Sequence, residues 1–149
     1  MKTIFLMLSL VLVGCTTLQI PSYIKSEHPY SKKVYGDYNK IVYAVRDVLV
    51  RNGWKIKTIT TPTIYERTLE GDENSNILIF TEVKEQSMVL ATSYTHLNVL
   101  ILSIADGAMI EIRYGKLTQM PFKQMRSSRN DQLANAMLGQ IEQKMLETK

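Results

Sequence analysis

The sequence predicts an α+β fold in two layers, because three features of its pattern agree. Two segments, one in the first half of the chain and one at its end, have apolar residues at the spacings of three and four that are typical of amphipathic helices. Between them, short runs alternate apolar and polar residues, as strands do. This order predicts an N-terminal helix, a meandering, mostly antiparallel sheet of five or six strands, and a long C-terminal helix, with the helices on one side of the sheet.

The first helix is predicted over residues 37–52. Asp37 is expected to cap its N-terminus and Gly53 to end it. Its apolar stripe consists of Tyr38, Ile41, Val42, Val45, Val48 and Leu49.

Strands are expected to follow Gly53, and Pro62 is expected to interrupt the chain after the first of them. The predicted strands are 54–59, 63–70, 77–83, 87–95, 98–105 and 108–115, with a loop at 71–76. Residues 98–105 are apolar on both faces, which indicates a central strand or a helix packed against the sheet. Asp106-Gly107 is a hairpin signal between the last two runs.

The strand at 108–115 is expected to have one polar and one buried face. Its polar face holds Met109, Glu111 and Arg113, and its buried face holds Ile110, Ile112 and Tyr114. After a loop with Pro121, Ser128-x-x-Asp131 indicates the start of the closing helix. One face of that helix carries Ala134, Met137, Leu138, Ile141 and Met145.

The N-terminus has the layout of an export signal. Lys2 supplies a positive charge, and residues 3–13 form an apolar run that is shorter than the roughly 20 residues needed to cross a membrane. The run ends at Leu12-Val13-Gly14-Cys15, which contains the only cysteine in the sequence, so no internal disulfide is expected.

These four residues resemble the lipobox of bacterial lipoproteins. The resemblance implies that residues 1–14 are removed as a signal peptide, that Cys15 is diacylglycerylated, and that the new amino group is acylated. Two or more acyl chains hold a protein stably on a membrane. Thr16 stands where an inner-membrane retention signal has Asp, so the resemblance implies sorting to the outer membrane, facing the periplasm, in a Gram-negative cell. The alternative is an ordinary signal peptide with a cysteine near its end.

The chain after the signal divides into a tether and one domain. Residues 15–36 contain Pro21 and Pro29 without periodicity and are predicted as the lipidated cysteine and a tether, and residues 37–149 as a single α+β domain. Alternatively, the apolar residues of this segment dock on the domain as an irregular arm; these are Tyr23, Ile24, Tyr30 and Tyr35.

The order of elements and the motif Gly53-Trp54-Lys55-Ile56 are similar to the helix-grip domains of BamC, an accessory lipoprotein of outer-membrane β-barrel assembly, and to other small envelope lipoproteins. No functional residue is carried across from this similarity.

The charge pattern argues against a nucleic-acid partner. Removal of Lys2 leaves a net charge of about +3, and no run of five Lys or Arg occurs. Four basic residues flank the loop before the last helix and either contact lipid headgroups or an acidic partner, or form a solvated edge. They are Lys116, Lys123, Arg126 and Arg129.

No constellation for catalysis, metal or cofactor binding is recognisable. His28 lies in the predicted tether and His96 in a predicted turn, where each is expected to face solvent. The glutamates of the predicted strands are expected to point outward, residues 70–74 lack the spacing of a calcium loop, and the methionines are expected to fill the core rather than bind copper. The glutamates in question are Glu66, Glu82 and Glu111.

The sequence therefore predicts a non-enzymatic, lipid-anchored envelope protein that acts by binding. Its expected partners are the membrane, through the acyl chains, and another envelope protein during outer-membrane or envelope assembly. The alternative is a small-ligand or lipid carrier with an apolar cavity between the sheet and residues 131–147.

Overall fold

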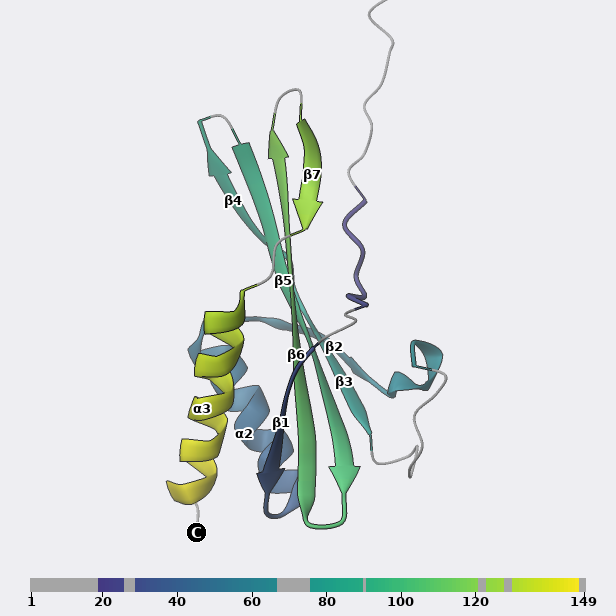
Figure 1. Cartoon of the computed structure of the whole chain (residues 1–149), viewed down its shortest axis with the longest axis vertical. Helices are drawn as coiled ribbons and strands as arrows, with labels where there is room; N and C mark the ends of the chain where they lie inside the picture. The colour runs from purple at the N-terminus through teal and green to yellow at the C-terminus, as the bar shows by residue number, and fades with distance from the viewer. Residues whose placement is uncertain are drawn as a thin grey trace, which may run out of the picture.

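A computed structural model describes residues 19–25, 29–66, 76–89, 91–120, 123–127 and 130–147. The α+β class, with one helix before and one after most of the sheet, is confirmed (Figure 1). In chain order the elements are β1 (Tyr30–Tyr35), α2 (Tyr38–Arg51), β2 (Ile56–Thr60), the 3₁₀ helix η2 (Pro62–Ile64), β3 (Ile77–Thr81), β4 (Lys84–Met88), β5 (Ala91–Ile104), β6 (Gly107–Met120), β7 (Lys123–Ser127) and α3 (Asp131–Glu147). None of the helices within these ranges has the length and apolar character to cross a membrane.

The sheet is built on the long hairpin of β5 and β6, which are 14 residues each. All strand pairs are antiparallel, and the order is β1-β6-β5-β3-β2. Beyond β3, β4 continues along β5, and beyond β1, β7 continues along β6. The helices lie against the half of the sheet that contains β1, and the β4 and β7 half extends past them (Figure 1).

The hairpin predicted at Asp106-Gly107 is confirmed. Ile104 pairs with Gly107, so Ala105 and Asp106 form the turn. Gly107 has a φ of +157°, and a Cβ there would lie 2.1 Å from the backbone oxygen of Val34. Glycine is therefore required at this position because β1 approaches it so closely.

A single apolar core fills the space between the sheet and the two helices. All five residues predicted for the inner face of α3 are buried: Ala134, Met137, Leu138, Ile141 and Met145. They pack against fully buried residues of β5 and β6, among them Ile101 and Ile110. Side chains thus occupy the interface at which a carrier was expected to hold its ligand.

The predicted ends of α2 agree with the structure, whereas α3 is capped differently. Asp37 Oδ1 accepts a hydrogen bond from Lys40 N at 2.9 Å, and Gly53 follows the helix with a φ of +73°. At α3, the side chain of Asn130 accepts from Leu133 N at 3.0 Å. Asn130 directly precedes the helix and so caps it, a role predicted for Ser128, which lies outside the described residues.

Two strand predictions are wrong. The described part of 63–70 is not a strand, because Pro62 begins a 3₁₀ turn in which the backbone nitrogens of Tyr65 and Glu66 donate to its carbonyl oxygen. Runs 87–95 and 98–105 are not separated by a turn. His96 and Leu97 pair with β6, so residues 91–104 form one continuous strand, β5, whereas Ser87 and Met88 belong to β4.

Residues predicted as a tether are part of the folded structure. Tyr30–Tyr35 form β1, which pairs with Gly107–Ile112 of β6. Residues 19–25, called here the N-terminal arm, run along the side of the sheet that faces away from the helices (Figure 1). The alternative interpretation, in which Tyr23 and Ile24 dock on the domain, is confirmed.

Candidate functional site

The side of the sheet that faces away from α2 and α3, called here the outer face, is set by the alternation of β5. Leu97, Val99 and Ile101 belong to the helix-side core. Side chains alternate along a strand, so His96 and Asn98, which flank Leu97, point to the outer face. Both are buried. His96 was predicted to face solvent in a turn; this prediction is wrong, because the residue lies within the continuous strand β5.

A small apolar cluster lies on the outer face, separate from the helix-side core. It consists of Leu78, Phe80 and Leu100, with Tyr23 and Leu102 packed against it. Tyr65 stacks on Tyr23 with ring centres 5.0 Å apart and lies 5.3 Å from Phe80. These aromatic contacts join the arm and the segment after η2 to the sheet.

Asn98 holds the N-terminal arm on the outer face by two hydrogen bonds. Ile24 N donates to Asn98 Oδ1 at 2.6 Å, and Asn98 Nδ2 donates to the backbone oxygen of Ser22 at 3.1 Å. The Asn98 side chain is fully buried and so matches the arm's backbone groups in the absence of water. The backbone of the arm is therefore held by a side chain of β5.

Arg113 forms an ion cluster beside the arm. Its Nη1 donates to Glu66 at 2.5 Å and to the Tyr23 hydroxyl at 2.8 Å, and its Nη2 donates to Glu111 at 2.9 Å. Arg113 was expected on a solvent-facing side of its strand but is only 6% exposed. Burial would lower its pKa, but the hydrogen bonds to Glu111 and Glu66 outweigh burial and raise the pKa above its ordinary value.

Glu66 and Glu111 come together on this arginine, although Glu66 was expected to point outward from a strand. Burial would raise the pKa of Glu66, but hydrogen bonds from Tyr23 and Arg113 outweigh it and hold the pKa below its ordinary value. Glu66 is thus a carboxylate, whereas a glycosidase needs one carboxyl group with a raised pKa as its general acid. Glu82 is exposed and follows β3, apart from the cluster.

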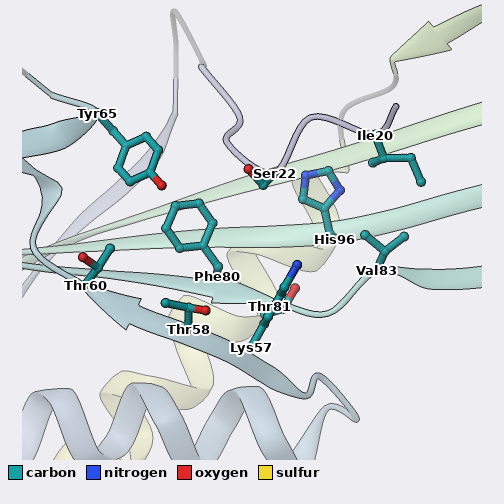
Figure 2. A pocket seen from close by; sticks show the side chains of 10 residues that line it. All are labelled: Ile20, Ser22, Lys57, Thr58, Thr60, Tyr65, Phe80, Thr81, Val83 and His96. Atoms are coloured by element: carbon teal, nitrogen blue, oxygen red, sulfur yellow. The ribbon is translucent and has the colours of Figure 1, made fainter. Parts of the chain in front are cut away.

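Next to this cluster the outer face contains a pocket of about 270 Å³. Figure 2 shows Phe80 in the middle of its lining, with Tyr65 on one side and His96 on the other. Ten residues line the pocket. They are Ile20 and Ser22 of the arm; Lys57, Thr58 and Thr60 of β2; Tyr65, which follows η2; Phe80 and Thr81 of β3; Val83, which follows β3; and His96 of β5.

His96 is a buried histidine at the wall of this pocket. It is 3% exposed, both ring nitrogens are closed off from solvent, and neither makes a hydrogen bond of standard geometry with a described residue, although the backbone of Pro21 lies near the ring. Burial lowers the pKa of His96, and the nearby backbone of Pro21 opposes this effect without reversing it. The ring is therefore neutral at pH 7, with one nitrogen able to donate a hydrogen bond and the other able to accept one.

The other residues singled out from the sequence lie elsewhere. Cys15, His28, residues 70–74 and Arg129 are outside the described residues. Lys116 lies on β6, opposite Thr95, and is half-buried. Lys123 and Arg126 belong to β7, where they pair with Met120 and Thr118 of β6. Three of the four basic residues thus lie on the β6–β7 hairpin, a strand pair rather than a loop.

The polar residues of the outer face left a weak signal in the sequence. Asn98 stands inside the apolar run 97–102, His96 directly precedes that run, and Arg113 follows three alternating apolar residues. A polar residue within a buried run is itself informative, because it must find a partner when it is buried. Among the described residues no group of three His, Cys, Asp or Glu is placed to hold a metal.

Comparison of the sequence with protein families finds no family model that matches, and comparison with curated proteins finds no match.

Proposed function

We propose that this chain is a lipid-anchored envelope protein that acts by binding another envelope protein, as an accessory in outer-membrane or envelope assembly. The lipobox-like Leu12-Val13-Gly14-Cys15 supports the anchor and the outer-membrane location. The observation that carries the binding role is the free edge of β2, with exposed apolar side chains beside it.

β4 and β7 are the edge strands of one half of the described sheet, and β1 and β2 are the edge strands of the other. In the half that contains β1 and β2, the two edges differ in how they are covered. β1 lies beside α3, and Lys32 Nζ is 2.6 Å from Glu142 Oε2 on that helix. Among the described strands, β2 pairs only with β3, so its other edge presents unpaired backbone groups. Such an edge accepts an extended segment of another protein as an additional strand.

Apolar side chains near the β2 edge favour a protein partner over solvent. Ile59 is 42% exposed, Ile64 is 75% exposed and Val83 is 42% exposed. Main-chain hydrogen bonds to β2 would give affinity, and these side chains would select the residues of the added strand.

Site-specific photo-crosslinking in the native envelope tests the partner proposal. A benzoylphenylalanine in place of Ile59 should form one discrete adduct with an envelope protein, and the same group in place of the exposed Gln143 on α3 should not. The same adducts at both positions, or none at Ile59, would refute binding through the β2 edge. Cys15→Ser should abolish metabolic labelling with palmitate, which tests the anchor separately.

The arrangement of charged groups supports binding rather than catalysis. Arg113 forms ion pairs with both carboxylates that the fold brings together, Glu66 and Glu111. His96 has no carboxylate or hydroxyl partner among the described residues that would make it part of a nucleophile-activating pair.

A ligand carrier is the second candidate, favoured by the pocket at His96. This pocket lies on the outer face, whereas the interface with α3 is filled by residues such as Ile101, Ile110 and Ile141. A carrier of this fold would therefore hold its ligand between the sheet and the N-terminal arm.

A further inference from the structure

One end of the sheet extends past both helices, and two hairpins reach it: β4 with β5, and β6 with β7 (Figure 1). This region is called here the hairpin end and comprises residues 84–89, 91–95, 116–120 and 123–127. Where β4 turns into β5, Met88 is 57% exposed and Val89 is 99% exposed. Hairpin turns are usually made of Gly, Asn, Asp, Pro or Ser. Large apolar side chains exposed at such a turn therefore indicate a surface that contacts another body.

The hairpin end is also positively charged. Besides Lys84, whose ammonium group lies over the ring of Trp54 at 3.7 Å, it contains three basic residues. These are Lys116 on β6 and Lys123 and Arg126 on β7. Within the same segments the sequence has a single carboxylate, Glu85. Exposed apolar groups next to an excess of basic residues match an anionic phospholipid surface, which attracts each basic residue by about 1 kcal/mol.

The N-terminal arm runs toward the hairpin end. Ile24 N donates to Asn98 of β5, whereas Ile20, nearer the N-terminus, lines the pocket with His96. His96 precedes Asn98 on a strand that begins at Ala91. Followed back from Ile24 to Ile20, the arm thus runs along β5 toward the end at which β4 turns into β5 (Figure 1).

The length of chain between the arm and Cys15 limits how far the domain can lie from a membrane that holds Cys15. Cys15 stands five residues before Ile20, and five residues span at most about 18 Å when extended. From His96 to Ala91, β5 covers a similar length, about 17 Å. Because Ile20 lies beside His96, Cys15 cannot be much farther from the arm than the hairpin end is. A bilayer that holds the acyl chains of Cys15 is therefore within reach of the hairpin end.

We propose that the hairpin end is a membrane-docking surface, at which Met88 and Val89 enter the headgroup region of an anionic phospholipid bilayer. The basic residues of β6 and β7 are attracted by the lipid phosphates. This inference rests on the proposed lipid anchor at Cys15 and adds the orientation of the domain on the membrane. β2 belongs to the other half of the sheet, so its free edge stays available to a protein partner.

Paramagnetic relaxation measured by NMR tests this orientation. The ¹⁵N-labelled chain from residue 15 onward is coupled through Cys15 to a maleimide lipid in nanodiscs of phosphatidylethanolamine and phosphatidylglycerol, some of which carry a nitroxide on the headgroup. The amide signals of Met88 and Val89 should be strongly attenuated. The signal of Asp106, at the opposite end of the β5–β6 hairpin, should not be. Equal attenuation at both ends, or stronger attenuation of Asp106, would overturn the inference.

Two changes identify which interactions hold the domain in this orientation. Val89→Glu should reduce the attenuation of the Met88 signal several-fold, whereas Val50→Glu, the same change at a 61% exposed position of α2, should leave it unchanged. The remaining amide signals show that both variants are folded. Phosphatidylcholine in place of phosphatidylglycerol should also weaken the attenuation, because it removes the negative charge of the surface. Unchanged attenuation after either the Val89→Glu substitution or the lipid exchange would contradict docking on an anionic bilayer.

This test and the palmitate labelling of Cys15 can fail independently, because the maleimide coupling supplies the anchor chemically. Palmitate on Cys15 together with equal attenuation at both ends would refute the docking surface and leave the anchor standing. Absence of palmitate would refute the anchor, while the nanodisc measurement would still decide whether the hairpin end binds the bilayer. A benzoylphenylalanine in place of Val89 that forms a discrete adduct with a protein in the native envelope would show that a protein covers this end, and would also overturn the inference.

Discussion

On the helix side of β5, Leu97, Val99 and Ile101 are closed off from solvent by two helices, and their neighbours are almost all aliphatic. On the outer side of the same strand, His96 and Asn98 lie beneath a short arm of the chain. Both sides are buried, but different chemistry holds them. The helix side depends on apolar area, and the outer side depends on hydrogen bonds and an ion cluster in addition to a small apolar cluster.

The difference has a physical consequence for dynamics. Helices of 14 and 17 residues can cover a continuous apolar surface, whereas residues 19–25 are too few to do so. Individual hydrogen bonds contribute about 0.5–1.5 kcal/mol each, so the arm can open locally at a free-energy cost well below that of global unfolding. A face covered by a segment that can open locally is suited to binding, whereas a face covered by two packed helices is suited to stability.

The largest expected effect is on the helix side. Ile101→Ala should lower the free energy of unfolding by about 2–5 kcal/mol, because it leaves a cavity in a fully buried core. Urea denaturation followed by circular dichroism measures the loss. Ser103→Ala, on an exposed part of the same strand, should change stability by less than about 0.5 kcal/mol. A similar small change for Ile101→Ala would contradict the packed core.

The ion cluster should come next. Arg113→Met removes the shared partner of Glu66 and Glu111 and should cost about 1–3 kcal/mol, because the two carboxylates remain partly buried without it. Arg46→Met, on the exposed side of α2, is the matched control and should have almost no effect in the same urea titration. If both variants lose equal stability, Arg113 has no special role on the outer face.

A more local effect is expected from Asn98→Ala, which removes both hydrogen bonds to the arm. Stability should fall by about 1–2 kcal/mol, and trypsin should cleave after the exposed Lys25 several-fold faster. Fluorescence of Trp54, which lies in the helix-side core, should stay unchanged in the folded state. Asn39→Ala on α2 serves as the control. Unchanged cleavage in Asn98→Ala would show that the arm is held by other contacts.

The smallest effect is the pH dependence that the outer face adds. The pKa of His96 is lowered by burial, so its contribution to stability is complete above its ordinary pKa of 6.5 and is lost as pH falls below that value. The pKa of Glu66 is also lowered on folding, so its contribution is lost as pH falls below 4.5. His96→Leu should flatten the stability profile in the upper range, and Glu66→Gln in the lower range. Urea titrations from about pH 2 to pH 7 measure both, and an unchanged profile in either variant would contradict its assignment.

Sequence patterns identified the helix side with few errors. The spacings in α2 and α3, the Asp37 cap and the Asp106-Gly107 turn all reflect interactions between near neighbours in the chain. The errors lie where a local signal was overridden. Thr63 and Ile64 have the β-branched composition of a strand, but Pro62 starts a 3₁₀ turn there. His96 was predicted in a turn between two strands, but β6 pairs with residues 92–104 as one strand.

The candidate site could not be predicted from the sequence, because its partners are distant along the chain. Glu66 and Glu111 lie on different predicted strands, and nothing near either residue in the sequence indicates that both bind Arg113. Tyr23 belongs to a segment with no periodicity, and Pro21, Ser22 and the rest of the arm read as a tether.

The sequence by itself determined the α+β class, both helices, the hairpin and the composition of the helix-side core. It did so because the spacing of apolar residues along each helix and strand indicates which of its sides is buried, and this spacing involves only near neighbours in the chain. Only the tertiary structure decided that the outer face is buried, since Arg113 meets Tyr23 from 90 positions away and Asn98 meets Ser22 from 76 positions away. Hydrogen bonds over such separations leave no periodic pattern in the sequence, so the arm, the ion cluster and the pocket at His96 exist only once the chain is folded.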